Sequence, residues 1–170
     1  MHILRQIKLA DLVTILALVS GMISIFFMFK EMFFYAVVSL IIAIILDGID
    51  GRIARMLKSK KGFVFGRQLD SLADMVNFGV AIPLLGYSIG FSSSVSIAVF
   101  IFYSICTMLR LAKFNIQTEK GFRGLPTTAS AIIILLFFAF GIHQYTGQWF
   151  LLIFFILGIL MVSDFKFPKL

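Results

Sequence analysis

The sequence predicts an all-α fold, an integral membrane bundle of six transmembrane helices. The 170-residue chain is 61% hydrophobic and has a mean hydropathy of +1.06, far above the values of soluble domains. Six apolar segments follow one another along it, and its basic residues gather at alternate connections between them. Because only 14% of the residues are charged, the chain lacks the polar surface that a soluble fold of this length needs.

The apolar segments extend over the whole chain, so residues 1–170 are expected to form a single membrane domain. The segments are residues 12–29, 32–46, 69–90, 94–112, 125–142 and 148–163. The second has only about 14 apolar residues, fewer than the roughly 20 that cross a hydrocarbon core. Since helix-compatible sequence continues through DGIDGRIARML, this helix is expected to project beyond the membrane with its polar end at the interface.

The N-terminal stretch MHILRQIKLADLV runs directly into the first apolar segment without a small-residue cleavage site, so no removable signal peptide is expected. Residues 1–11 interleave apolar side chains with Arg5 and Lys8, a pattern that is typical of a short interfacial helix. A frayed terminus is the alternative for this stretch.

The basic residues predict the orientation of the bundle, because Lys and Arg accumulate in cytoplasmic loops. Of the fifteen basic residues, only Lys30 falls on one side of the predicted spans. The others fall on the opposite side and are Arg5, Lys8, Arg52, Arg55, Lys58, Lys60, Lys61, Arg67, Arg110, Lys113, Lys120, Arg123, Lys166 and Lys169. Both termini are therefore predicted to be cytoplasmic in a multi-pass protein of the cell membrane.

The net charge of +7 follows from this distribution of basic residues around the predicted spans. An anionic membrane surface or an anionic substrate is therefore the expected partner, and nucleic acid is not. The single cysteine, Cys106, lies in an apolar run and has no second thiol to pair with. A buried, inert side chain is favoured over a nucleophile at this position.

Four of the eight acidic residues lie in one stretch, residues 46–81. Asp47 and Asp50 are three residues apart at the end of the second helix, and Asp70 and Asp74 are four apart at the start of the third. Residues at these spacings share one face of a helix. Because consecutive helices run in opposite directions, the two pairs are predicted to converge at one depth, near the cytoplasmic boundary.

Four carboxylates in a partly dehydrated cleft repel one another, so a cation is expected among them. Oxygen ligands favour hard divalent ions such as Mg²⁺, Mn²⁺ or Ca²⁺, and the two histidines, His2 and His143, are remote in sequence. Two such ions held by shared carboxylates are a known means of assisting displacement at phosphorus. Helix capping and salt bridges to neighbouring Lys and Arg residues are the alternative explanation for these acids.

The stretches DGIDGRIAR and GRQLDSLAD resemble the signature of the CDP-alcohol phosphatidyltransferase family, D-x-x-D-G-x-x-A-R followed by G-x-x-x-D-x-x-x-D. All eight signature positions match, namely Asp47, Asp50, Gly51, Ala54, Arg55, Gly66, Asp70 and Asp74. The resemblance implies six transmembrane helices with a cytoplasmic active site, a homodimer, and transfer of a phosphatidyl group from a CDP-linked lipid such as CDP-diacylglycerol to an alcohol, with release of CMP. Whether the lipid tails are diacyl or ether-linked is left open.

The resemblance also implies roles for individual residues. The four aspartates would hold two divalent ions, Mg²⁺ or Mn²⁺ and possibly Ca²⁺, and Asp74 would act as the general base. The CDP-linked lipid would lie against a set of signature residues, which are Asp47, Gly51, Ala54, Arg55 and Gly66.

Three further stretches, LDSLADMVNFGVA, MLRLAKFNI and FRGLPTTAS, are similar to the branch of the family that uses L-serine as the acceptor. The expected contacts to serine are then Asn77, Arg110, Lys113 and Arg123. Glycerol 3-phosphate or an inositol phosphate is the alternative acceptor. A divalent-cation transporter is the alternative from another class, but the acids lie near one face, no inverted repeat is visible, and the glycine and arginine of the signature would have no role.

Overall fold

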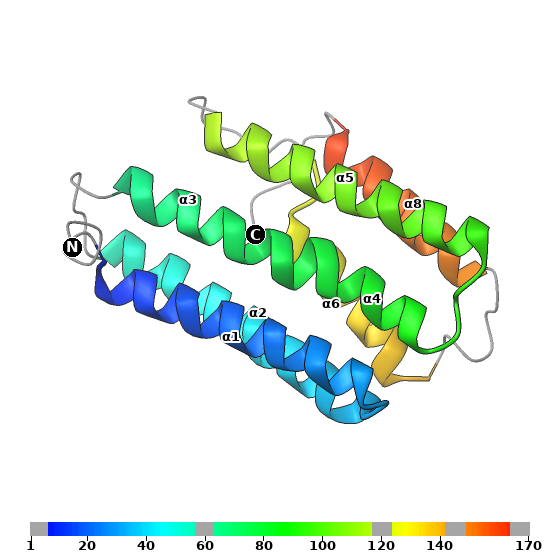
Figure 1. The fold of residues 1–170 in the computed structure, drawn as a ribbon. Coiled ribbons are helices and arrows are strands. Elements are labelled where there is room, and N and C mark those ends of the chain that lie inside the picture. The colour runs from blue at the N-terminus through cyan, green and yellow to red at the C-terminus, as the bar shows by residue number, and fades with distance from the viewer. Residues whose placement is uncertain (1–6, 57–62, 117–123, 142–148, 164–170) are drawn as a thin grey trace.

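A computed structural model of the chain describes residues 7–56, 63–116, 124–141 and 149–163. These residues form helices and turns and contain no β-strand (Figure 1). The helices are α1 (Leu9–Phe29), α2 (Phe33–Met56), α3 (Phe63–Asp74), a π-helix (Met75–Val80), α4 (Ala81–Ser88), α5 (Ser94–Ile116), α6 (Thr127–Ala139) and α8 (Trp149–Val162). The predicted all-α fold is confirmed for the described residues.

Helices α1 and α2 form an antiparallel pair that packs closely along its length (Figure 1). Small residues make the close approach possible, and two serines of α1 donate hydrogen bonds to backbone carbonyls of α2. Ser20 Oγ bonds to the carbonyl of Ser39 at 2.8 Å, and Ser24 Oγ bonds to that of Ala36 at 2.9 Å. These two bonds fix the axial register of α1 against α2.

The third span is a continuous helical rod made of α3, the π-helix and α4 (Figure 1). In the π-helix, the amide of Ala81 donates to the carbonyl of Val76, five residues back. The Asn77 side chain is buried and lies against α1, where a Cβ on Gly21 would overlap its Oδ1. On the other side, Ser104 Oγ of α5 donates to the carbonyl of Gly79 at 2.6 Å. The π-helix is therefore held between α1 and α5.

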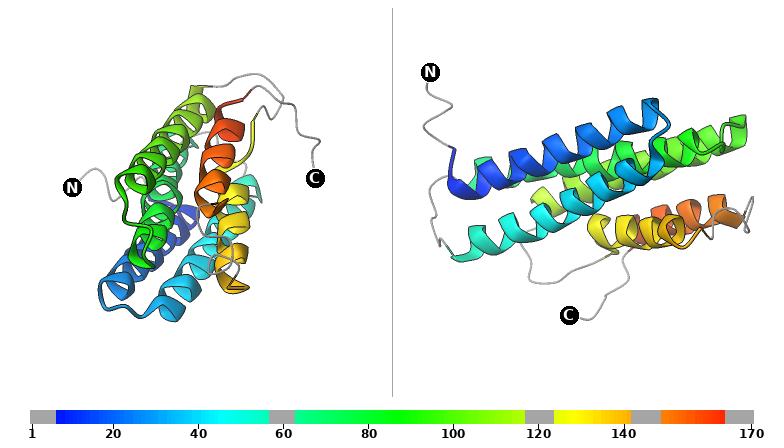
Figure 2. Two further views of the ribbon diagram at one scale, coloured as in Figure 1. Left: turned by 90° about the vertical axis from the view of Figure 1, so that its right-hand side faces the viewer. Right: turned by 90° about the horizontal axis from the view of Figure 1, so that it is seen from below.

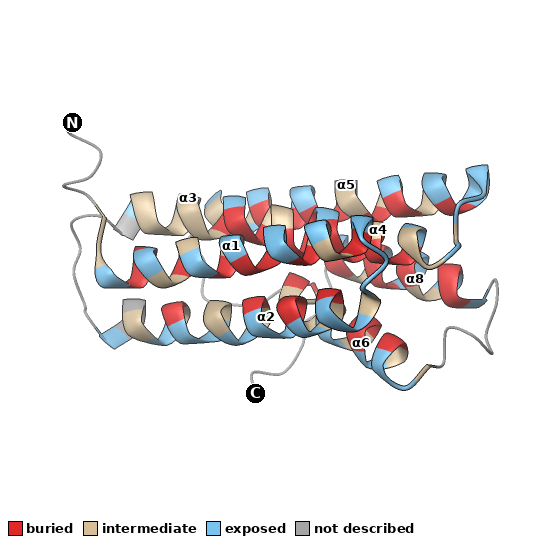
Figure 3. Cartoon of the chain, turned by 60° about the horizontal axis from the view of Figure 1, so that its bottom comes forward, coloured by how far each residue is buried: buried red, intermediate tan, exposed pale blue. Residues whose placement is uncertain are grey.

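The remaining helices complete the bundle around this rod. α8 packs along α5, and α6 contacts both α2 and α8 (Figure 2). Phe154 of α8 packs edge to face against Phe100 and Tyr103 of α5, and Phe150 packs edge to face against Phe154 within α8. Exposed residues follow the outward faces of the helices while buried ones point inward (Figure 3), and many of the exposed side chains are large and apolar, as in a protein surrounded by lipid.

Four helical spans are long and apolar enough to cross a membrane, namely Leu9–Phe29, Phe33–Ile53, Val64–Ser88 and Ser94–Ile116. Helices α6 and α8 are apolar but have only 13 and 14 residues in the described structure. The chain is thus a multi-pass membrane protein, whereas the number of six spans and the orientation of the termini stay predictions.

Several boundaries differ from those of the apolar segments. The second helix continues to Met56, which confirms its predicted extension past Asp47. The third begins at Phe63, earlier than the apolar segment 69–90, because α3 packs against α1 and this packing outweighs the low helix propensity of Val64 and Gly66. Residues 1–6 of the predicted interfacial helix lie outside the described residues, and the stretch from Leu9 onward belongs to α1.

The contact between Gly21 and Asn77 predicts a stability difference between two glycine variants. Gly21→Ala places a methyl group on the Asn77 amide, so we expect a loss of about 1 to 3 kcal/mol in the free energy of unfolding. Gly48→Ala on α2 meets nothing within 4 Å and is expected to leave stability unchanged or to raise it by up to about 1 kcal/mol. Thermal unfolding of the purified protein in detergent measures both.

The double variant Gly21→Ala with Asn77→Ala provides the control, because it removes the overlapping amide. It is expected to unfold at a higher temperature than Gly21→Ala alone. Equal losses in the single and the double variant would contradict this account of the helix contact.

Candidate metal centre

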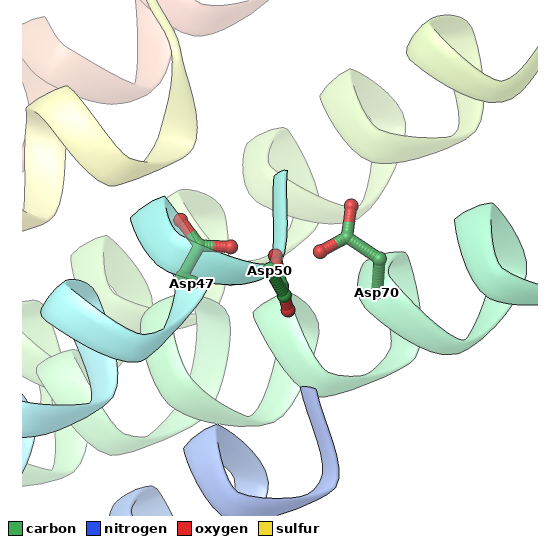
Figure 4. A group of neighbouring side chains, drawn as sticks. All are labelled: Asp47, Asp50 and Asp70. Atoms are coloured by element: carbon green, nitrogen blue, oxygen red, sulfur yellow. The ribbon is translucent and has the colours of Figure 1, made fainter. Parts of the chain in front are cut away.

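The four aspartates of the two sequence pairs lie together between α2 and α3. Asp47 and Asp50 on α2 and Asp70 on α3 present oxygen atoms within 4.8 Å of one another, and Figure 4 shows the three carboxylates gathered in one place. Asp74, one turn further along α3, has its carboxyl group in contact with that of Asp47. The predicted convergence of the two pairs is confirmed.

The positions of these residues within their helices argue against helix capping. Asp70 is the eighth residue of α3, whose first turn contains no acidic residue. Asp47 and Asp50 are more than one turn from the end of α2 at Met56. Asp50 and Asp74 are buried, and Asp47 and Asp70 are half-buried. Clustered, partly desolvated carboxylates are the donor set that hard divalent cations prefer, so the site fits such an ion.

Hydroxyl groups from two other helices contact this cluster. Thr14 of α1 donates to Asp50 Oδ2 at 2.5 Å, and Thr128 of α6 donates to Asp47 Oδ2 at 3.2 Å. Neither threonine was predicted from the sequence as a residue of the site. A polar side chain in a mostly apolar helix was the available signal for Thr14.

The two glycines of the signature have different surroundings. A Cβ on Gly51 would meet nothing within 4 Å, so space is open beside this turn of α2. A Cβ on Gly66 would lie 2.6 Å from Asp11 Oδ1 of α1. Asp11 is a buried carboxylate whose other oxygen accepts the amide hydrogen of Lys8 at 2.8 Å. Gly66 thus permits a close approach of α1 to α3, a constraint that the sequence did not reveal.

Other predicted site residues lie on α2 and α5. Ala54 and Arg55 belong to α2, and the structure does not describe their side chains. Lys113 lies half-buried in the last turn of α5. Arg110 is buried, and its Nε donates to the carbonyl of Leu125 at 3.2 Å, just before α6.

Asn77 and Arg123 were also predicted to bind serine. Asn77 is 1% exposed and faces Gly21 of α1, and within the described part of the chain its amide atoms have no hydrogen-bond partner. Arg123 lies outside the described residues. Cys106 is buried on α5, as an inert thiol is expected to be.

Comparison with known proteins identifies the family. Residues 7–162 match the CDP-alcohol phosphatidyltransferase family. The chain belongs to this family. The eight signature positions inferred from the sequence all lie inside the matched range, on α2 and α3.

Named relatives of the family are similar over nearly the whole chain. The CDP-diacylglycerol--serine O-phosphatidyltransferase of Methanocaldococcus jannaschii is 37% identical over 167 residues, which cover 97% of this chain and 76% of the relative. The enzyme of the same name from Helicobacter pylori is 34% identical, with 94% and 71% covered. The archaetidylserine synthase of Methanothermobacter thermautotrophicus is 32% identical, with 96% and 70% covered.

The carboxylate cluster predicts that a divalent cation stabilises the fold. Mn²⁺ added to the purified protein is expected to raise the temperature of unfolding, because it binds the folded site and offsets the repulsion among the carboxylates. At a Mn²⁺ concentration about one hundred times the dissociation constant, the free energy of unfolding is expected to rise by about 2.7 kcal/mol. Asp70→Asn should reduce this gain, since it removes one of the three clustered ligands.

The matched control is Glu31→Gln, which removes an exposed carboxylate beyond the other end of α1. It should keep the full stabilisation by Mn²⁺. An unfolding temperature that does not respond to Mn²⁺, or an equal loss of response in both variants, would contradict the prediction.

Proposed function

We propose that the protein transfers a phosphatidyl group from CDP-diacylglycerol, or from an ether-linked counterpart, to the hydroxyl group of L-serine and releases CMP. The observation that carries the proposal is the similarity, at 32–37% identity over most of the chain, to relatives whose names specify this reaction with serine. The carboxylate cluster at the signature positions supplies the chemistry that such a transfer needs.

The reaction is a displacement at the phosphorus that carries the lipid. The serine Oγ forms a bond to this phosphorus, and the bond from phosphorus to the CMP oxygen breaks. Two divalent cations, Mg²⁺ or Mn²⁺ with Ca²⁺ as an alternative, would be held by Asp47, Asp50, Asp70 and Asp74 and would stabilise the charge on the pyrophosphate and on the departing CMP.

Asp74 is the proposed general base, and it accepts the proton of the serine hydroxyl as the new bond forms. Its position in the site suits this role, because it is buried and its carboxyl group adjoins that of Asp47. Its burial keeps bulk water from competing for the proton.

The CDP portion of the lipid is proposed to lie along α2. The open space beside Gly51 leaves room for the nucleotide at the turn between the aspartates and Arg55. Ala54 has a small side chain that would leave room for the ligand, and the guanidinium group of Arg55 suits a phosphate. Asp47 completes the set of residues assigned to this ligand, whereas the space beside Gly66 is filled by the Asp11 carboxylate of α1.

The carboxylate of serine requires a cation near the site. Lys113, in the last turn of α5, is the strongest of the four proposed contacts because it is half-buried and basic. Arg110, Asn77 and Arg123 remain proposed contacts as well, with Arg110 also bonded to the backbone that leads into α6.

The site is proposed to face the cytoplasm in a six-span, single-domain homodimer of the cell membrane. This orientation is supported by the basic residues, since only Lys30 of the fifteen lies on the opposite side of the predicted spans. A divalent-cation transporter is disfavoured, because the family match covers residues 7–162 and includes the glycine and arginine positions that transport would leave without a role.

The proposed reaction predicts serine-dependent release of CMP. Purified protein in detergent with Mn²⁺ and CDP-diacylglycerol should release CMP with L-serine and not with glycerol 3-phosphate or inositol phosphate. The rate of CMP release from the ether-linked CDP-lipid, measured in parallel, shows which lipid tails the protein prefers. Asp74→Asn is expected to lower the rate at least about 100-fold, because it removes the base.

Glu31→Gln serves as the control in this assay and should retain the activity. Release of CMP with another acceptor would overturn the assignment of serine. The proposed reaction would be overturned if protein that shows a normal thermal unfolding transition released no CMP with any acceptor.

The role of Lys113 predicts a selective effect on serine binding. Lys113→Met is expected to raise the KM for L-serine about 10- to 100-fold, because a charge-assisted hydrogen bond is lost. The KM for CDP-diacylglycerol should change little. Lys30→Met, on the opposite side of the predicted spans, is the control. An unchanged KM for serine would remove Lys113 from the serine site.

A further inference from the structure

Two threonines outside the family signature contact the proposed metal ligands from opposite sides. Thr14 comes from α1 and Thr128 from α6, so neither belongs to the α2 and α3 helices that carry the aspartates. Each donates to an oxygen of a different carboxylate on α2, Thr14 to Asp50 and Thr128 to Asp47. The contacts therefore link the cluster to the rest of the bundle.

The Thr14 hydroxyl is committed to Asp50 by its geometry. Thr14 is 4% exposed, and its Oγ1 lies 3.2 Å from the carbonyl of Ala10 and 2.5 Å from Asp50 Oδ2. A hydroxyl group has one hydrogen, so the two acceptors compete for it. The shorter contact is in the range of a hydrogen bond to an ionised oxygen, which is about twice as strong as a neutral one.

The Thr128 hydroxyl is held in place by the segment that leads into α6. Gly124 has a φ of +84°, and a Cβ there would lie 2.6 Å from the carbonyl oxygen of Met161. The amide of Leu125 donates to the carbonyl of Leu160 at 3.0 Å, and its carbonyl accepts from Arg110 Nε at 3.2 Å. These contacts fix the start of α6, and Thr128 is its second residue.

We propose that Thr14 and Thr128 are positioning residues for the metal site, and that their hydroxyl groups set the rotation of the Asp50 and Asp47 carboxylates. The inference rests on the proposed function, because it assumes that these carboxylates bind divalent ions. A carboxylate on a flexible side chain loses rotational freedom when it binds a metal, and a hydrogen bond made beforehand reduces this loss. The threonines therefore raise the affinity of the site without contacting the metal or the substrate.

The test compares variants that remove a hydroxyl with variants that retain it. Thr14→Val and Thr128→Val keep the shape of the side chain and delete the donor, whereas Thr14→Ser and Thr128→Ser keep the donor. Thr107→Val is the matched control, because Thr107 is a fully buried threonine whose hydroxyl bonds to the carbonyl of Tyr103 in its own helix. Unfolding temperatures without metal establish that each variant is folded.

The first readout is the affinity for Mn²⁺, obtained from the electron paramagnetic resonance signal of the free ion during titration of the purified protein. Each valine variant is expected to bind Mn²⁺ about 10-fold or more weakly, the effect typical of losing an outer hydrogen bond to a metal ligand. The serine variants and Thr107→Val should bind like the unmodified protein. If one valine variant fails to fold, the Mn²⁺ affinity of the other valine variant tests the proposal.

The second readout is CMP release as a function of Mn²⁺ concentration. The valine variants should need more Mn²⁺ for half-maximal activity. At saturating Mn²⁺ their rates should approach that of the unmodified protein, because the substitutions weaken metal binding and leave the general base in place. Unchanged Mn²⁺ affinity in both valine variants, or an equal loss in the valine and serine variants, would overturn the inference.

Failure of the proposed function gives a different pattern of results. Unmodified protein that binds Mn²⁺ but releases no CMP with serine would overturn the proposed reaction, while the affinities of the variants would still decide the role of the threonines. Unmodified protein that binds no Mn²⁺ would overturn the metal site and this inference together.

Discussion

The structure depends on holding four carboxylates together at one end of an apolar bundle. A carboxylate at membrane depth is costly to desolvate, and grouped carboxylates also repel one another. The neighbouring helices offset part of this cost, since α1 and α6 supply hydroxyl donors to Asp50 and Asp47. The proposed divalent cations would offset the rest. The close packing of α1 against α2 and α3 is therefore a requirement of the site as well as of the fold.

Sequence spacing predicted the convergence of the aspartates because each pair lies within one helix and the two helices are consecutive. The helix-compatible sequence after the second apolar segment predicted that α2 continues past Asp47. The contacts of Thr14 and Asp11 were not predictable in this way. Thr14 and Asp50 are 36 residues apart, and their meeting depends on how α1 packs, which no local pattern encodes. Asp11 likewise reaches Gly66 only because α1 crosses α3 at that level.

The two signature glycines show that one residue type meets two demands in a single motif. At Gly51 the missing side chain leaves space open next to the carboxylates, as a ligand requires. At Gly66 the space that a side chain would fill is occupied by the Asp11 carboxylate, which lies against the backbone. Asp11 also caps the start of α1. The position of Thr14, less than one turn further along α1, is thus coupled to the contact at Gly66.

The π-helix determines where the polar face of the third span ends. In an uninterrupted α-helix, Asp70, Asp74 and Asn77 would lie on one stripe, because they are spaced i, i+4 and i+7. A π-turn adds a residue and shifts the phase of the following side chains by up to about 100°. Asn77 accordingly packs against Gly21 of α1, while the carbonyl of Gly79 accepts the Ser104 hydroxyl from α5. The π-helix begins directly after Asp74, so Asp74 is the last residue of α3 and the last carboxylate on the polar face of this span.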